Sequence, residues 1–330
     1  MLSRWLPQEK PLVEVEEQIE ELKRLAAREH LDLSEKIDHL EARKQTLMAE
    51  IFKSLSPWHP KRPSPLDYIN ALCSEWVELH GDRAYADDGA IVAGLGRFKK
   101  RPIAIVGNQK GRDTKERQDR NFGQPSPEGL RKAERVMQMA GRYGRPILSF
   151  VDTPGAACSP DAEERGISEA IAKNQWLMSS LPVPIVVVII GEGCSGGAIA
   201  TALGDVVLML EHSYYSVISP EGCASILYRD PAKAPQSAEA LGITAQDALN
   251  FGIIDEILPE PLGGAHRDFP TMSLTLGEAV DRHFTKLSEL DSDELLERRY
   301  QRFRKLGQVD EPALIAESIS QNGQEHKVAI

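Results

Sequence analysis

The sequence contains no run of apolar residues that approaches the roughly 18 positions needed for a membrane-spanning helix. Its first segment, MLSRWLPQEKPLVEVEEQIEEL, turns acidic at once and has no apolar core of a signal peptide. These two absences predict a cytoplasmic protein without a membrane partner.

Cysteine is scarce and scattered. The four cysteines form no C-x-x-C pair, and the eight histidines form no H-E-x-x-H motif. Zinc sites and disulfide frameworks usually show such close spacing. We therefore expect reduced thiols and no metal ion bound by this chain. The cysteines are Cys73, Cys158, Cys194 and Cys223.

Positive charge is also in short supply, because 39 Lys and Arg face 50 Asp and Glu, and the net charge is -11. A general nucleic-acid-binding protein is usually basic, so no nucleic-acid partner is expected. No G-x-x-x-x-G-K-[ST] loop occurs, which argues against a P-loop nucleotide hydrolase. With 330 residues, 41% of them hydrophobic, the chain is long enough for a large packed core.

The first part of the chain divides into a helical hairpin and a linker. Apolar residues recur every three or four positions and predict two antiparallel helices within residues 1–56. The proline-rich segment SPWHPKRPSP and a short helix over 66–79 are then assigned to residues 57–79. Such a hairpin buries little surface, so we expect it to contact the main domain or a partner subunit. Its apolar positions are Leu12, Val15, Ile19, Leu22, Leu25, Leu33, Ile37, Leu40, Leu47 and Ile51.

Strands and helices alternate over residues 80–262. The segments AIVAGL, PIAIVGN, ILSFVD, IVVVII and DVVLML are almost continuously apolar, which is typical of strands in a sheet covered on both faces. One helix is expected to start at Ser126, an N-cap residue followed by Pro127, and another to run through ERGISEAIAKNQWLMSSL. The fold class is therefore α/β.

The final part, residues 263–330, is predicted to form C-terminal helices followed by a polar tail. Apolar periodicity favours helices over 276–287 and 292–306. From Gln308 the chain is polar, and we expect this tail to be disordered.

A glycine-rich stretch, GEGCSGGAIA, follows the strand VPIVVVII without a spacer. One interpretation is a nucleophile elbow, because the stretch contains the G-x-S-x-G pattern around Ser195. Ser195 would then need a histidine base and a carboxylate that orients the base. The downstream candidates are His212, His266, His283 and His326, with Asp205 and Asp255 as orienting groups.

Three further interpretations need no reactive side chain. Gly191, Gly193 and Gly196 match a dinucleotide fingerprint, with Glu211 as the acidic residue about 20 positions later, although the motif comes late in the chain. The glycines could also serve tight packing alone. Finally, SGGAIATAL predicts the start of a helix whose backbone N–H groups are open to a ligand. Those donors would belong to Gly196, Gly197 and Ala198.

Two more segments invite a functional reading. DTPGAACSPDAEERG follows another buried strand, and Asp152 and Thr153 stand at the strand end, where sites of α/β proteins gather. The segment over 97–123 is basic within an acidic chain. It favours an anionic ligand or an acidic partner, or else a surface whose cations are paired internally.

The motifs together resemble the alpha subunit of the bacterial-type acetyl-CoA carboxylase carboxyltransferase. The resemblance covers roughly residues 80–307, and the hairpin and linker also fit. The matching stretches include GDRAYADDGAIVAGLGRF, GNQKGRDTKERQDRNFGQPSPEGLRKAERVMQMA, FVDTPGA, AEERGISEAIAKN, IIGEGCSGGA, YSVISPEGCASILYRD, KAPQSAEALGIT, ILPEPLGGAHR and RRYQRFRKLG.

The resemblance implies a crotonase-like fold, a spiral of ββα turns. It implies transfer of a carboxyl group from carboxybiotin to acetyl-CoA, which gives malonyl-CoA for fatty-acid synthesis. The biotin is carried on a biotin carboxyl carrier protein, and ATP is used by a separate biotin carboxylase. A beta subunit that carries zinc would complete an α2β2 assembly.

The resemblance also implies roles for named residues. The amides of Gly197 and Ala198 would bind the ureido oxygen of biotin, with Gly196 leaving room. Gly155, Ala156 and Gly193 would line the substrate pocket. Relatives usually read DTPGAYPG where this chain reads DTPGAACS, so Ala157, Cys158 and Ser159 replace Tyr-Pro-Gly, and any tyrosine contact is absent.

Two other functions remain open on the residues alone. An independent crotonase-type hydratase or isomerase would need acid–base residues in this chain, and Glu192 and Glu221 are the candidates. A non-catalytic assembly subunit would depend mainly on the N-terminal hairpin.

Overall fold

The computed structural model describes residues 9–29, 31–53 and 62–307. Most of the predicted proline-rich linker, the polar tail and His326 lie outside the described residues.

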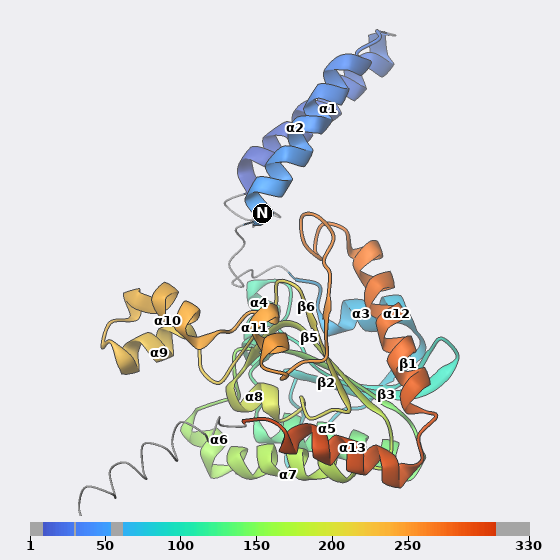
Figure 1. The fold of residues 1–330 in the computed structure, drawn as a ribbon, viewed down its shortest axis with the longest axis vertical. Helices are drawn as coiled ribbons and strands as arrows, with labels where there is room; N and C mark the ends of the chain where they lie inside the picture. Colours follow the sequence, from blue (N-terminus) through green and yellow to red (C-terminus); the bar gives the residue numbers. More distant parts are fainter. Residues whose placement is uncertain (1–8, 30, 54–61, 308–330) are drawn as a thin grey trace, which may run out of the picture.

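The described core is built on one mixed sheet with helices on both faces (Figure 1). The strand order is β1-β2-β3-β4-β5-β6-β8, and β7 pairs with the far end of β5. The pairs β1–β2 and β2–β3 are antiparallel, and the later pairs are parallel. The strands are β1 (Cys73–Glu78), β2 (Ile91–Phe98), β3 (Arg101–Asn108), β4 (Ile147–Thr153), β5 (Ile185–Cys194), β6 (Val206–Leu210), β7 (Tyr214–Ser216) and β8 (Glu256–Leu258).

The two faces of the sheet follow from the alternation of side chains along each strand. One face packs on α3 (Pro65–Leu72) and α12 (Phe269–Leu287), and its residues include Leu148, Phe150 and Val188. The other face packs mainly on α5 (Pro127–Arg142), and its residues include Ile147 and Val187. Because both faces are covered, the central strands read as continuous apolar runs, as the sequence predicts.

The helices after β4 and β5 were also expected, with shifted bounds. Ser126 is the N-cap of α5 and Pro127 its first residue. The segment predicted as one helix is broken at Gly166, whose φ of 80° separates α6 (Pro160–Glu164) from α7 (Ile167–Ser180). The other helices are α4 (Thr114–Asp119), α8 (Ser195–Ile199), α9 (Pro220–Leu227), α10 (Ala234–Leu241), α11 (Ala245–Asn250) and α13 (Ser292–Arg304).

The predicted helix over 66–79 is wrong beyond Leu72. The chain leaves α3 there and forms β1, which pairs antiparallel with β2. β1 is an edge strand with an irregular register between Ser74 and Val77, so its burial pattern gave a weak strand signal. Pairing with an existing sheet edge decides the conformation here, and local sequence does not encode it.

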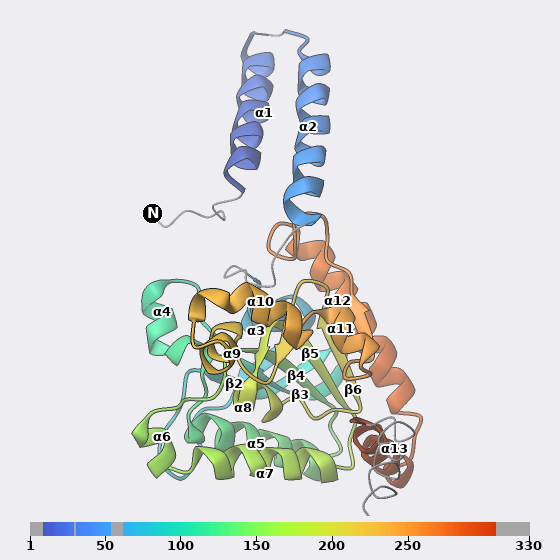
Figure 2. The same cartoon turned by 60° about the vertical axis from the view of Figure 1, so that its left-hand side comes forward.

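The N-terminal hairpin of α1 (Lys10–Glu29) and α2 (Ser34–Lys53) projects from the core (Figures 1 and 2). Its contact with the main domain was expected and is confirmed at the base. Buried Glu9 accepts hydrogen bonds from Arg267 at 2.8 Å and pairs with His266 at 3.1 Å. Burial lowers the pKa of His266, with a smaller opposing effect from Glu9.

The amino end of the parallel strands is closed by a buried ion pair. Arg299 of α13 bonds both carboxylate oxygens of Asp205, which directly precedes β6, at 2.8 and 2.7 Å. The same guanidinium donates to the carbonyls of Met178, Leu181 and Val183. Both charged side chains are nearly inaccessible, so this pair ties α13 and the end of α7 to the sheet.

Candidate functional site

The candidate site lies at the carboxyl end of β4 and β5, where the glycine-rich loops meet. β5 extends through Gly191 to Cys194, so half of the glycine stretch is strand rather than loop. The predicted helix after it is short, because α8 spans only five residues from Ser195 to Ile199. In parallel α/β sheets this edge is where ligands bind.

Each of the four glycines leaves space that a neighbouring group occupies. A Cβ at Gly191 would lie 2.4 Å from an Asp152 carboxylate oxygen. A Cβ at Gly193 would lie 2.8 Å from the Tyr215 ring, and one at Gly196 would lie 2.9 Å from Ile171. The packing interpretation of the glycines is therefore correct for these positions, whatever else they do.

Gly197 serves a different purpose, because its neighbour is backbone. A Cβ there would lie 2.5 Å from the Gly155 carbonyl carbon and 2.7 Å from the Ala156 nitrogen. The turn after β5 thus touches the turn after β4 main chain to main chain. Thr153 holds the second turn, since its hydroxyl donates to the Gly155 carbonyl at 2.8 Å and accepts the Gly155 N–H at 3.1 Å.

Ser195, the first residue of α8, has a φ of 56°, in the left-handed region that a serine rarely adopts. Strain of this kind costs about 1–3 kcal/mol and concentrates at functional sites. The short helix leaves the N–H groups of its first turn, including those of Gly196 and Gly197, without intrahelical partners.

A large apolar cavity of about 950 Å³ opens beside Ser195 and Gly196. Burial raises the pKa of Tyr215 in its wall to about 12, so this phenol stays neutral at physiological pH. Lys305 also lines the cavity. The apolar side chains that line it include Ile199, Val217, Leu241, Phe251 and Leu306.

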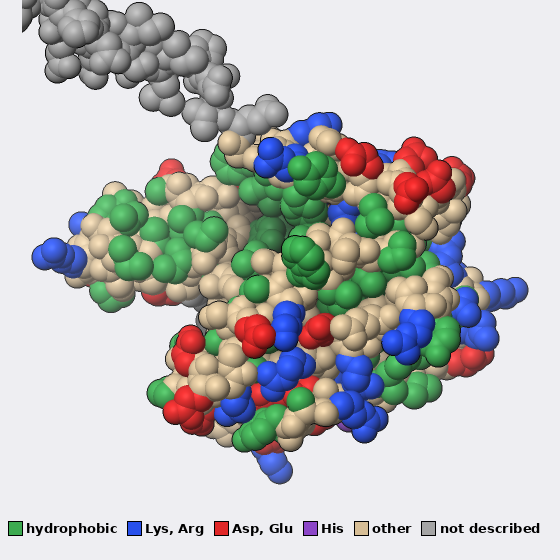
Figure 3. Space-filling view, turned by 90° about the horizontal axis from the view of Figure 1, so that it is seen from below, with side chains coloured by type: hydrophobic (Ala, Val, Ile, Leu, Met, Phe, Trp, Pro, Cys, Tyr) green, Lys and Arg blue, Asp and Glu red, His purple; other side chains and the backbone are tan. Residues whose placement is uncertain are grey.

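A lobe formed by α9 and α10 stands out from the body of the molecule near this cavity (Figure 1). Figure 3 shows a hollow between this lobe and the body, with apolar side chains on its walls. Val217, Ile226 and Leu227, in and before α9, are among the large apolar residues that remain exposed. Large exposed apolar patches are typical of contact surfaces for a partner.

A second, smaller cavity of about 190 Å³ lies on the other side of the β5 end and is polar. Lys110, which follows β3, forms an ion pair with Asp152 at 2.8 Å and another with Glu192. The Asp152 carboxylate also accepts the Glu192 N–H at 2.9 Å. Arg62, Arg117 and Phe122 complete part of its lining.

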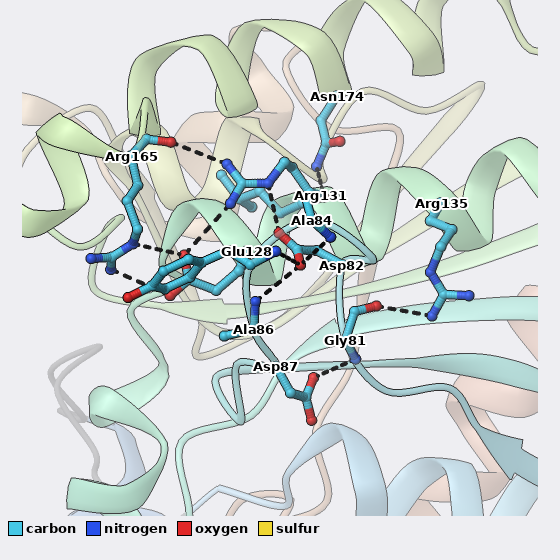
Figure 4. A network of polar contacts seen from close by, with 12 residues as sticks. Gly81, Asp82, Ala84, Ala86, Asp87, Glu128, Arg131, Arg135, Arg165 and Asn174 are labelled. Atoms are coloured by element: carbon cyan, nitrogen blue, oxygen red, sulfur yellow. Dashed lines mark hydrogen bonds and ion pairs between the residues drawn. The ribbon is translucent and has the colours of Figure 1, made fainter.

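The loop between β1 and β2 forms an outer wall of the same edge (Figure 4). Asp82 accepts the N–H groups of Ala84, Tyr85 and Ala86 and pairs with Arg131 of α5 at 2.8 Å. Burial acts to raise the pKa of Asp82, but the backbone N–H donors and Arg131 outweigh it and hold the pKa at about 2.

The network continues from α5 to the start of α7. Arg131 also donates to the Arg165 carbonyl, and the Arg165 side chain bonds Glu128. The Arg165 guanidinium stacks over the Tyr85 ring with 4.9 Å to the centroid. Predicted as a residue that offsets the helix dipole, Glu128 instead has Arg165 as its ionic partner.

The hydrolase interpretation of Ser195 does not survive the topology. Asp205 and Asp255 lie at the amino end of the strands, bound to Arg299 and Arg302, whereas Ser195 lies at the carboxyl end. His266 and His283 bond Glu9 and Glu256. Among the described residues, Ser195 has no hydrogen bond to a histidine.

The side chains of the other two alternatives are also engaged elsewhere. Glu211, the acidic residue of the dinucleotide interpretation, accepts the Glu260 N–H at 3.0 Å. Glu192, a candidate acid–base residue for a hydratase, is held by Lys110. Glu221 lies in the first turn of α9.

The basic segment is largely paired within the chain. Arg97, Lys99 and Arg112 bond Glu75, Asp281 and Asp67, and Arg120 bonds Glu116. Internal pairing therefore accounts for much of this local charge. The cation that stands apart is Lys110, because its two carboxylate partners lie at strand ends beside the site.

Cys194 and Cys223 are buried, whereas Cys158 is exposed. Burial and the nearby Glu192 raise the pKa of Cys194 to about 11, so its thiol is protonated and unreactive near neutral pH. Within the ranges that the structure describes, no cluster of three or more His, Cys, Asp or Glu has the arrangement of a metal site. None of the described helices is long and apolar enough to cross a membrane.

The sequence reasoning missed Lys110, Arg299 and the Asp82 network. Each depends on contacts between distant segments, and the Arg299–Asp205 pair spans 94 positions. One signal was available for Lys110, which stands just after a buried strand, as Asp152 and Glu192 stand at the ends of the next two.

The fold defines the class of the protein. The structure resembles the transcarboxylase 12S core with methylmalonyl-coenzyme A bound, with a TM-score of 0.56 and 20% identity over 72% of this chain and 44% of that chain. It also resembles a Pseudomonas malonate decarboxylase hetero-tetramer in complex with coenzyme A, with a TM-score of 0.56 and 16% identity over 79% of this chain and 100% of that chain. The predicted crotonase-like fold is confirmed, and it is the fold of crotonase-like carboxyltransferases.

Sequence comparison then gives the family. Residues 5–307 match the family described as acetyl co-enzyme A carboxylase carboxyltransferase-like, and the chain belongs to it. Acetyl-coenzyme A carboxylase carboxyl transferase subunit alpha of Burkholderia vietnamiensis is 50% identical over 94% of this chain and 98% of its own length. The subunit of the same name from Prochlorococcus marinus is 51% identical over 95% and 96%. The family prediction is thus confirmed.

Proposed function

We propose that the chain is the alpha subunit of an acetyl-CoA carboxylase carboxyltransferase. In this reaction a carboxyl group moves from carboxybiotin, held on a carrier protein, to acetyl-CoA and gives malonyl-CoA, the precursor for fatty-acid synthesis. Membership of the family and about 50% identity over nearly the whole chain support this activity.

The single observation that carries the site is the main-chain contact of the two turns. Gly197 lies against Gly155 and Ala156 so closely that no side chain fits between them. The N–H groups from Gly196 to Ala198 are therefore the donors we assign to catalysis. Gly155, Ala156 and Gly193 shape the pocket around them.

The residues present fit a biotin group. The 950 Å³ cavity is long enough to take an apolar ring system and its chain, and it ends at Ser195 and Gly196. When bound, biotin supplies the carboxyl group and the ureido system that takes up negative charge as that group leaves. Backbone N–H donors aimed at such a charge lower a barrier by roughly 3–4 kcal/mol each, because they need no reorganisation. Ser195 positions the turn and does not act as a nucleophile.

The partners are part of the proposal. A carboxyltransferase beta subunit, with its own zinc, supplies the rest of the acetyl-CoA site in an α2β2 assembly, and the exposed lobe of α9 and α10 offers a surface for contact. A biotin carboxyl carrier protein and a biotin carboxylase deliver the carboxyl group. We place the reaction in the cytoplasm.

A reconstitution assay tests this function. Malonyl-CoA formation from a free carboxybiotin donor is measured with this chain alone, with a beta subunit alone and with both. Activity only in the mixture is the expected result. Hydration of a crotonyl thioester by this chain alone would overturn the proposal in favour of an independent hydratase.

A further inference from the structure

Lys110 connects the ends of three adjacent parallel strands just before the site. It follows β3, and its ammonium group pairs with Asp152 in the last turn of β4 and with Glu192 near the end of β5. The Asp152 carboxylate in turn accepts the Glu192 N–H. Two residues beyond Glu192 the strand ends, and the strained Ser195 begins the turn.

Two glycines make this arrangement possible. A Cβ at Gly191 would collide with the Asp152 carboxylate at 2.4 Å. A Cβ at Gly123, which has a φ of 77°, would lie 2.6 Å from Cγ of Lys110. The left-handed turn that contains Gly123 therefore packs directly on the lysine stem and limits where its ammonium group can go.

The exposure of the three charged groups distinguishes them from a structural lock. The Asp152 side chain is 9% exposed, whereas Lys110 and Glu192 are 24% and 28% exposed and line the polar cavity. A partly hydrated ion pair contributes little to global stability. It can still fix the direction of the strand that carries the catalytic turn.

We propose that Lys110 is a positioning residue, which sets the β5–α8 turn and its N–H donors through Asp152 and Glu192. The inference rests on the proposed function for its kinetic consequence, but its structural consequence is independent of any activity. Lys110 touches no reacting atom in this scheme.

The first test compares Lys110→Met, Lys110→Arg and Lys99→Met in the complex with the beta subunit. Lys110→Met is expected to lower kcat for carboxyl transfer by about tenfold to hundredfold, because misplaced catalytic groups are costly. The KM for acetyl-CoA should change by less than about twofold. Lys110→Arg should restore much of kcat, since a guanidinium also reaches two carboxylates. Lys99→Met, which breaks an exposed pair with Asp281, is the matched control and should keep kcat.

The second test is hydrogen exchange of the amides from 191 to 198 in the full chain. Lys110→Met should speed exchange in this segment and leave the amides of α5 unchanged. Unchanged kcat, or lower kcat with unchanged exchange in this segment, would overturn the positioning role. If Lys110→Met fails to fold, Glu192→Gln replaces it and should show the same pattern at smaller size. An inactive wild-type complex would defeat the proposed function alone, because the exchange result still decides the role of Lys110.

Discussion

At the amino end of the parallel strands, Arg299 and Asp205 form a closed ion pair, whereas at the carboxyl end Lys110 holds Asp152 and Glu192 beside a cavity. The first pair is 1% and 2% exposed, and every nearby carbonyl that it reaches is bonded. The second is partly hydrated. One sheet thus uses the same chemistry for stability at one end and for placing a site at the other.

The backbone differs between the two ends as well. The carboxyl end carries the left-handed Ser195, Gly155 with a φ of 144°, and glycines whose neighbours leave no room for a side chain. Such strain persists only where surrounding structure enforces it. The difference teaches that the amino end and the packed helices supply the stability which the carboxyl end gives up.

The largest expected effect breaks the amino-end lock. Arg299→Met leaves Asp205 charged and buried without its partner, which should lower the free energy of unfolding by about 3–5 kcal/mol. Chemical denaturation measures the change. Arg97→Met breaks the exposed pair with Glu75 and should cost less than about 1 kcal/mol. Similar losses for the two variants would erase the contrast between locked and exposed pairs.

The next effect falls on activity at the carboxyl end. Gly197→Ala places a Cβ 2.5 Å from the Gly155 backbone and must push the two turns apart. We expect kcat of the reconstituted complex to fall about a hundredfold, because the N–H donors lose their positions. Gly96→Ala is the control, since its Cβ would meet its nearest neighbour at 3.5 Å, an ordinary contact. Near wild-type kcat in Gly197→Ala would contradict the assigned site.

A smaller effect depends on pH and on the loop wall of Figure 4. The pKa of Asp82 is about 2 in the folded chain, below the value near 3.9 of an unfolded aspartate. Its stabilising contribution is therefore present above about pH 4 and is lost as the pH falls toward 2. Asp82→Asn should flatten the loss of stability over this window, as measured by denaturation at stepped pH. An unchanged slope would mean that Asp82 is not held in this way.

The smallest effect is expected at Ser195. Ser195→Ala keeps a Cβ in the same left-handed conformation and removes only the hydroxyl. If the turn works through its backbone, kcat should fall by less than about tenfold. Steady-state kinetics of the complex gives the answer. Complete loss of activity in a folded variant would restore Ser195 as a nucleophile.

Much of the core was predictable from the sequence. Continuous apolar strands indicated a sheet covered on both faces, and Ser126 with Pro127 marked the start of α5. β1 was missed because an edge strand with an irregular register has little pattern of its own. The break at Gly166 was missed because the flanking residues all favour helix.

The candidate site was predictable only in part. The glycine stretch pointed to the turn after β5, but its residues alone left a hydrolase, a nucleotide site and a packing role open. The tertiary structure separated these readings by placing Asp205 and Asp255 at the opposite end of the strands from Ser195. No local pattern records which end of a sheet a distant carboxylate reaches.

The sequence by itself determined the α/β class, the family and the position of the glycine-rich turns, because periodicity and motifs are local properties of the chain. Only the tertiary structure decided that Gly197 meets Gly155, that Lys110 meets Asp152 and Glu192, and that Arg299 meets Asp205. Those contacts join segments far apart in the chain, and they are set by strand order and helix packing rather than by neighbouring residues.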